Sequence, residues 1–117
     1  MPRILIVDDD RTTVNLLQTL LEMDGFDVAT AVNGQMALQT ADSIPPDVFL
    51  VDYHLSDMDG IELVGHLRSD SRFAQVPIVM ASGLDKEDDA LSAGANAFLI
   101  KPFEPDDLAH LFFNLLG

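Results

Sequence analysis

The chain has no cysteine among its 117 residues and only six basic residues against 20 acidic ones. Without cysteine there is no disulfide framework, no thiolate metal site and no cysteine nucleophile. The formal net charge of -14 repels phosphate backbones and anionic lipid headgroups. We therefore expect that this domain does not bind nucleic acid or membranes directly.

Long hydrophobic runs are also missing. The start of the chain turns to charged residues after Val7, which is too early for a signal peptide, and no later apolar run approaches the length of a membrane span. We therefore expect a cytoplasmic protein. The hydrophobic content of 48% is enough to fill one core, so we expect residues 1–117 to form one domain, with any output domain outside this chain.

Short apolar runs of strand length are present in their place, at residues 4–7, 27–30, 48–51, 77–81 and 97–100. The segments between them, and the segment after the last, carry apolar residues at helical spacing. These residues are Val14, Leu17 and Leu21, then Met36, Ala37 and Ala41, then Ile61, Val64 and Leu67, and finally Leu108, Leu111, Phe112 and Leu115. We expect the third helix to begin near Asp59, with its side chain as the cap, and the last helix to begin near Glu104 and Pro105.

Five strands that alternate with five helices require crossover connections. Wholly apolar strands are typical of a parallel sheet that is covered on both faces. The pattern therefore predicts a doubly wound α/β fold, with a five-stranded parallel sheet in the order 2-1-3-4-5.

Polar residues follow four of the predicted strands, where a doubly wound sheet binds its ligands. They are Asp8, Asp9 and Asp10 after the first strand, Asp52 after the third, Ser82 after the fourth and Lys101 after the fifth. Two carboxylates about 4 Å apart repel each other by roughly 4 kcal/mol at an effective dielectric constant of 20. The cluster must therefore hold a cation or be partly protonated, and Mg²⁺ suits carboxylate oxygens best.

A metal ion, a hydroxyl group and an ammonium group around an aspartate are the equipment for phosphoryl transfer to a carboxylate. The two cations neutralise charge on the phosphoryl oxygens while the aspartate attacks in line. Asp52 is the predicted nucleophile because it ends a central strand.

Four stretches of the chain also resemble one known family in their sequence and order. They are "ILIVDDD" (4–10), "DVFLVDYHLSDMDG" (47–60), "PIVMASG" (77–83) and "ALSAGANAFLIKPF" (90–103). Each motif alone is weakly specific, but together they are highly specific and extend over essentially the whole chain. The chain resembles a response-regulator receiver domain of two-component signalling, with the chemotaxis-regulator fold.

The resemblance implies that Asp52 accepts a phosphoryl group from a histidine kinase or a histidine phosphotransfer protein. It implies that Mg²⁺ or Mn²⁺ is bound by Asp8, Asp9, Asp52 and the main-chain carbonyl of His54. It further implies that Ser82 and Lys101 hold the phosphoryl oxygens. The domain would then be a signalling module, and not an enzyme beyond its own phosphorylation and dephosphorylation.

Three further positions carry roles by resemblance. Phe98 matches the aromatic switch residue that moves together with Ser82, although an aromatic residue in a strand equally often belongs to the core. This switch would change the surface of the fourth helix, fifth strand and fifth helix, and so control an output partner. His54 and Leu84 occupy the positions that tune dephosphorylation, and we expect His54 to dominate because Leu84 cannot orient a water molecule.

The last helix carries a second apolar stripe, Ala109, Phe113 and Leu116, which lies off its main apolar face at 100° per residue. The stripe indicates either a surface for homodimerisation or output-domain docking, or a helix that originally continued beyond Gly117.

Other interpretations fit less well. An aspartyl-phosphate phosphatase of the haloacid-dehalogenase type requires a second Asp at position 54, which is His54. A calcium-binding loop around Asp57 and Asp59 lacks its first ligand at Leu55, so we assign Asp59 to a helix cap and Asp57 to an exposed loop. The remaining alternative is a degenerate receiver that acts as a phosphorylation-independent interaction module.

Overall fold

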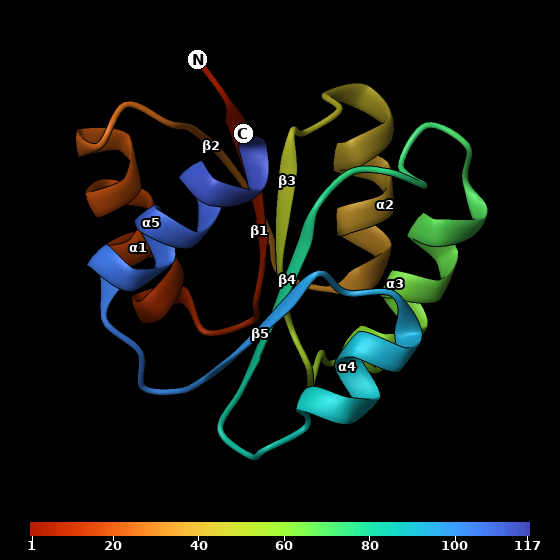
Figure 1. The fold of residues 1–117 in the computed structure, drawn as a ribbon. Coiled ribbons are helices and arrows are strands. Elements are labelled where there is room, and N and C mark those ends of the chain that lie inside the picture. Colours follow the sequence, from red (N-terminus) through yellow and green to blue (C-terminus); the bar gives the residue numbers. More distant parts are fainter.

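The computed structural model describes all residues from Met1 to Gly117 and contains five parallel strands in the order β2-β1-β3-β4-β5 (Figure 1). The strands are β1 (Arg3–Val7), β2 (Asp27–Ala31), β3 (Val48–Asp52), β4 (Ile78–Ser82) and β5 (Ala97–Ile100). The helices are α1 (Arg11–Met23), α2 (Gly34–Ser43), α3 (Gly60–Ser69), α4 (Glu87–Ala93) and α5 (Pro105–Leu116). The predicted fold class, strand order and number of helices are confirmed.

Two hydrophobic clusters lie on the two faces of the sheet. Along β1, Leu5 and Val7 point to the cluster beneath α2, α3 and α4, whereas Ile4 and Ile6 point to the cluster beneath α1 and α5. Figure 1 shows these two helix layers on opposite sides of the sheet. The central strands are apolar at nearly every position because both faces are buried, and each fully buried large side chain contributes about 1.5–3 kcal/mol.

The third and fifth helices, α3 and α5, begin at the predicted positions, next to Asp59 and at Pro105. Asp10 caps α1 by accepting hydrogen bonds from the backbone amides of Thr12 and Thr13. Asp59 is the N-terminal cap residue of α3, but its side chain makes no capping hydrogen bond, so the predicted side-chain cap is wrong. Of the apolar residues that indicated the second helix, Met36 is exposed because α2 packs through Ala37 and Ala41.

Asp57 has a structural role that the sequence analysis did not predict, because the residue was assigned only to an exposed loop. Its two carboxylate oxygens accept hydrogen bonds from the backbone amides of Gly34 (2.8 Å) and Gln35 (2.9 Å), at the start of α2. These bonds hold the pKa of Asp57 below its usual value, because they favour the ionised carboxylate. The residue is exposed as predicted, and it also ties the loop after β3 to α2.

Arg68 of α3 joins three segments on the side of the sheet that faces α4. Its guanidinium donates hydrogen bonds to backbone carbonyls of Gly94, Phe73, Ala74 and Val76 and to the Asn96 side chain. Partial burial lowers the pKa of Arg68 from its ordinary value, which still leaves it charged.

No helix has the length and apolar character needed to cross a lipid bilayer.

Replacing Arg68 with Ala should lower the free energy of unfolding by about 1–2 kcal/mol, because several carbonyls lose a charged donor together. Urea unfolding followed by circular dichroism measures the change. The control is Arg3→Ala, which removes one 3.3 Å side-chain hydrogen bond to the Pro45 carbonyl. Equal effects of the two substitutions would show that the Arg68 hydrogen bonds add no net stability.

Candidate functional site

The parallel register brings the ends of four strands to one edge of the sheet. Val7 pairs with Val51, Asp52 pairs with Ala81, and Ser82 pairs with Ile100. The residues that follow these strands therefore lie at the same level. The direction of winding reverses between β1 and β3, and this is where ligands bind in such sheets.

Asp8, Asp9 and Asp52 form an acidic cluster at this edge, with one carboxylate oxygen of each within 4.8 Å of the others. Asp8 is buried, Asp52 is partly buried and Asp9 is exposed. The Lys101 Nζ lies 2.8 Å from Oδ2 of Asp8 and 3.0 Å from Oδ1 of Asp52, so it bridges the two aspartates. The structure thus brings together four of the predicted site residues.

Burial raises the pKa of the Asp52 carboxyl above its usual value. The hydrogen bond and charge of Lys101 oppose this effect, while the charges of Asp8 and Asp9 add to it. Burial alone would lower the pKa of Lys101, but its hydrogen bonds to Asp8 and Asp52 outweigh burial and raise it. Lys101 is therefore an ammonium ion at neutral pH.

The raised pKa of Asp52 has a definite consequence for stability. The folded chain holds the Asp52 proton to a higher pH than the unfolded chain does. The contribution of Asp52 to folding stability therefore falls as pH rises through the interval just above the ordinary aspartate pKa. The single positive charge of Lys101 does not neutralise the negative charges of the three clustered carboxylates, so the site favours the binding of a second cation.

Ser82 lies at the end of β4 and is buried. Its Oγ accepts a hydrogen bond from the Leu84 amide at 3.1 Å, and its carbonyl accepts one from the Lys101 amide at 2.8 Å. The Lys101–Pro102 peptide bond is cis. The backbone bond between Ser82 and Lys101 fixes the two strand ends that carry the predicted phosphoryl-binding side chains.

The other predicted residues lie around this edge. Phe98 is partly buried and packs against the cluster beneath α2, α3 and α4. The His54 side chain is exposed and its ring makes an edge contact with Tyr53, with centroids 4.8 Å apart. Leu84 is 61% exposed, two residues after Ser82. The roles of these three residues stay predictions.

Gly60 is a site residue that the sequence analysis missed. Its amide donates a 2.6 Å hydrogen bond to the Tyr53 carbonyl, directly after Asp52. A Cβ atom at Gly60 would lie 2.5 Å from the Asp52 carbonyl oxygen. The loop that carries Asp52 therefore passes against the first residue of α3, and nothing in the local sequence reveals this contact.

The exposed apolar stripe predicted on the last helix is wrong at Ala109, which is buried in the cluster beneath α1 and α5. Leu116 is partly buried against the same cluster, because the sheet and α1 cover α5 more widely than a single face. Phe113 is half exposed, and its ring lies on Phe26 with centroids 4.8 Å apart. The three residues do not form a continuous exposed surface.

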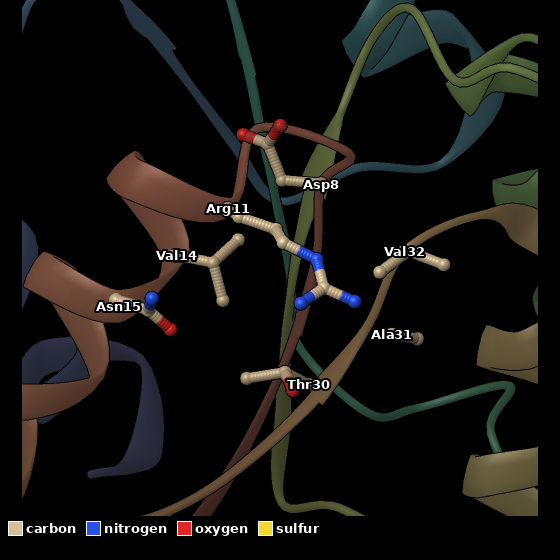
Figure 2. A pocket seen from close by; sticks show the side chains of 7 residues that line it. All are labelled: Asp8, Arg11, Val14, Asn15, Thr30, Ala31 and Val32. Carbon is tan, nitrogen blue, oxygen red and sulfur yellow. The ribbon is translucent and has the colours of Figure 1, made fainter.

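A cavity of about 200 Å³ adjoins the site on the β2 side (Figure 2). Figure 2 shows the Arg11 guanidinium extending over the end of β2 toward Thr30 and Val32, while the Asp8 carboxylate points away from it. The Arg11 side chain makes no hydrogen bond or ion pair within the chain. Asp8 therefore lines this cavity as well as the acidic cluster, but its carboxylate pairs with Lys101 and not with Arg11.

The donor set of the acidic cluster fits a hard divalent ion. Three aspartates offer carboxylate oxygens within a few ångströms, and Mg²⁺ is commonly held by one or two carboxylates together with water and phosphate oxygens. Asp9, the exposed member of the cluster, makes no side-chain hydrogen bond within the chain. Asp8, Asp9 and Asp52 are the side chains that would hold such an ion.

A doubly wound α/β domain with this cluster at its carboxyl edge matches the expectation from the sequence motifs. The family described as the response regulator receiver domain matches residues 4–112 of the chain. The chain belongs to this family and is a receiver domain of the two-component signalling type.

The chain is similar in sequence to two curated transcriptional regulators. It is 37% identical over 111 residues to the DNA-binding dual master transcriptional regulator RpaA of Synechocystis sp., covering 92% of this chain and 46% of that protein. It is 39% identical over 109 residues to the alkaline phosphatase synthesis transcriptional regulatory protein PhoP of Bacillus subtilis, covering 91% of this chain and 45% of that protein. The chain thus spans about half the length of the curated relatives it matches.

Solved structures with the same fold cover nearly the whole chain. The chemotaxis response regulator CheY4 of Vibrio cholerae aligns with a TM-score of 0.93 and 30% identity, covering 98% of each chain. The Francisella response regulator 1452 receiver domain aligns with a TM-score of 0.92 and 29% identity, covering 99% of this chain and 97% of that one.

Proposed function

We propose that this receiver domain is a phosphoacceptor in which Asp52 takes a phosphoryl group from a phosphohistidine. The donor is a histidine kinase or a histidine phosphotransfer protein, and the reaction depends on Mg²⁺ or Mn²⁺. The observation that carries the proposal is the position of Lys101 Nζ, which bridges Asp8 and Asp52 at the winding reversal of the sheet. That arrangement places an ammonium group beside the proposed nucleophile.

In the proposed reaction, a carboxylate oxygen of Asp52 attacks the phosphorus atom. An O–P bond forms, the N–P bond of the phosphohistidine breaks, and its electron pair stays on the imidazole nitrogen. The Lys101 ammonium moves its hydrogen bonds from the carboxylates to phosphoryl oxygens, and the Ser82 hydroxyl donates another. A bound Mg²⁺ ion supplies charge neutralisation at the phosphoryl oxygens.

In the proposed function, phosphorylation changes the surface formed by α4, β5 and α5. Ser82 moves toward the phosphoryl group, Phe98 turns inward, and the surface of α4, β5 and α5 changes its affinity for an output domain or a target protein. We place this activity in the cytoplasm, where kinases of this class present their phosphohistidine. The alternative function is a phosphorylation-independent interaction module.

Incubation with acetyl phosphate tests the function without knowledge of the kinase. With Mg²⁺ present, intact mass spectrometry should show the gain of one phosphoryl group, because the site supplies its own catalytic groups. The same mixture with EDTA should show no adduct, since three carboxylates then repel the donor. An adduct that forms equally in EDTA, or no adduct with Mg²⁺, would contradict the proposal and favour the alternative.

His54→Ala should lengthen the lifetime of the aspartyl phosphate roughly tenfold, which is less than the 10²–10⁴-fold typical of a positioned acid or base, because the His54 side chain is exposed. The decay of the adduct after removal of acetyl phosphate measures the lifetime. Leu84→Ala is the matched control and should leave the lifetime unchanged, because neither side chain can orient water. An unchanged lifetime in His54→Ala would refute the role of His54.

A further inference from the structure

Asn33 and Gly34 form the one Asn-Gly pair in the chain. In such a pair the glycine nitrogen can attack the side-chain carbonyl carbon of asparagine, because glycine has no Cβ atom to hinder the approach. Hydroxide takes the proton of the glycine amide, a C–N bond closes a succinimide ring, and the side-chain nitrogen leaves as ammonia. Water then opens the ring. Cleavage at the side-chain carbonyl carbon leaves aspartate, and cleavage at the main-chain carbonyl carbon leaves isoaspartate.

Both groups that must react are held by other hydrogen bonds in the structure. The Gly34 amide donates to Oδ1 of Asp57 at 2.8 Å, and Oδ1 of Asn33 accepts from the Met36 amide at 2.8 Å. The attacking nitrogen must first lose its proton. A carboxylate that accepts a hydrogen bond from that proton, and that carries the same charge as the nitrogen anion, disfavours this loss.

The Gly34 amide is also shielded from solvent. Gly34 is buried, and a Cβ atom there would lie 2.5 Å from Sδ of Met58, so the Met58 side chain stands directly against the glycine. Asp57 and Met58 are neighbours in the loop after β3, and Asp57 also binds the Gln35 amide at 2.9 Å. This loop therefore covers the nitrogen that hydroxide would have to reach.

We propose that Asn33 is a site of deamidation and that Asp57 is the residue that keeps it intact in the folded domain. The lowered pKa of Asp57 means that its carboxylate is ionised at neutral pH. Of the two products, aspartate can still cap α2, whereas isoaspartate adds a methylene group to the main chain and removes the cap. The inference does not depend on the proposed function, because no step involves Asp52.

The test is incubation of the folded chain in mildly alkaline buffer, with intact mass and peptide mapping to follow the exchange of side-chain nitrogen for oxygen. Asp57→Ala removes both acceptors and should deamidate at Asn33 at least about tenfold faster than the unaltered chain. This factor corresponds to less than the typical energy of one hydrogen bond to a charged group. Asn33→Asp should show no mass gain in the same peptide. In urea the unaltered chain and Asp57→Ala should deamidate at the same rate, since neither then holds the Gly34 amide.

Two control variants separate local protection from other effects. Asp47→Ala also removes an exposed carboxylate, which accepts a 2.7 Å hydrogen bond from the Arg3 amide at the opposite end of the sheet. Arg68→Ala lowers the global stability without touching Asn33. Both variants should deamidate at the rate of the unaltered chain, because the reaction needs only a local opening. Circular dichroism checks that each variant is folded.

Asp57→Asn provides a second test should Asp57→Ala not fold. Its side-chain oxygen still accepts one hydrogen bond but has no charge, so deamidation at Asn33 should be faster than in the unaltered chain and slower than in urea.

Three results would overturn the inference. One is an equal rate in the unaltered chain and in the folded Asp57 variants. Another is an equal acceleration by Arg68→Ala, which would show that the reaction follows global unfolding. The third is a mass gain that maps to Asn15, Asn96 or Asn114 in place of Asn33.

Discussion

Asp52→Asn should abolish the Mg²⁺-dependent phosphoryl adduct, slowing its formation by at least about 10³-fold, because the nucleophile itself is removed. An amide has no anionic oxygen with which to attack phosphorus. The fold should persist, since the substitution removes a charge whose burial raises its own pKa beside Asp8 and Asp9. Without metal, we expect a melting temperature at or above that of the unaltered chain.

Asp57→Asn is the matched control, with the same chemical change in the loop that follows Asp52 and β3. The Asp57 carboxylate binds the first amides of α2 and does not belong to the acidic cluster. This variant should therefore form the adduct at the rate of the unaltered chain, measured by intact mass over time. Persistence of the adduct in Asp52→Asn, located by peptide mapping, would assign the acceptor to another residue.

Gly60→Ala should lower the free energy of unfolding by about 3 kcal/mol, the upper part of the range for an overpacked site. The new Cβ would lie 2.5 Å from the Asp52 carbonyl oxygen and 2.7 Å from Cε of Met80. Met80 can turn away, but the carbonyl belongs to the strand end that carries the proposed nucleophile. The substitution should therefore also slow formation of the adduct.

Gly65→Ala provides the control within the same helix. Apart from the adjacent residues and the backbone of α3 itself, no atom lies within 4 Å of a Cβ at Gly65, so Ala there should stabilise the domain by about 0.5–1 kcal/mol through its better helix propensity. Urea unfolding of both variants gives the two free energies, and opposite signs are expected. If Gly60→Ala matches Gly65→Ala in both stability and adduct formation, the close approach of α3 to Asp52 is unimportant.

The sheet could be predicted from the sequence because a strand that is buried on both faces is a run of consecutive apolar residues. β1 and β3 are apolar at consecutive positions, and that pattern needs no knowledge of distant residues. The acidic cluster could be predicted for the same reason, since Asp8 directly follows β1 and Asp52 is the last residue of β3. Once the strand order was assumed, the meeting of Asp8, Asp52 and Lys101 at one edge followed from parallel pairing.

Contacts between side chains and distant backbone groups could not be predicted in this way. Asp57 binds amides 22 and 23 residues away, and Arg68 binds the Gly94 carbonyl 26 residues away. Such contacts depend on the positions of whole helices, which a local pattern does not contain. Ala109 was predicted to be exposed but is buried, for a related reason. Helical spacing gives the direction of a side chain, but it does not give how much of the helix the neighbouring elements cover.

The bridge from Lys101 to Asp8 has a consequence for biosynthesis, because it joins residues 93 positions apart in the chain. The aspartates of β1 and β3 leave the ribosome well before the lysine that neutralises them. A nascent chain that ends before Lys101 therefore lacks the ammonium group that bridges Asp8 and Asp52 in the complete domain. The full set of charged groups in the site is present only when nearly the whole domain has been translated.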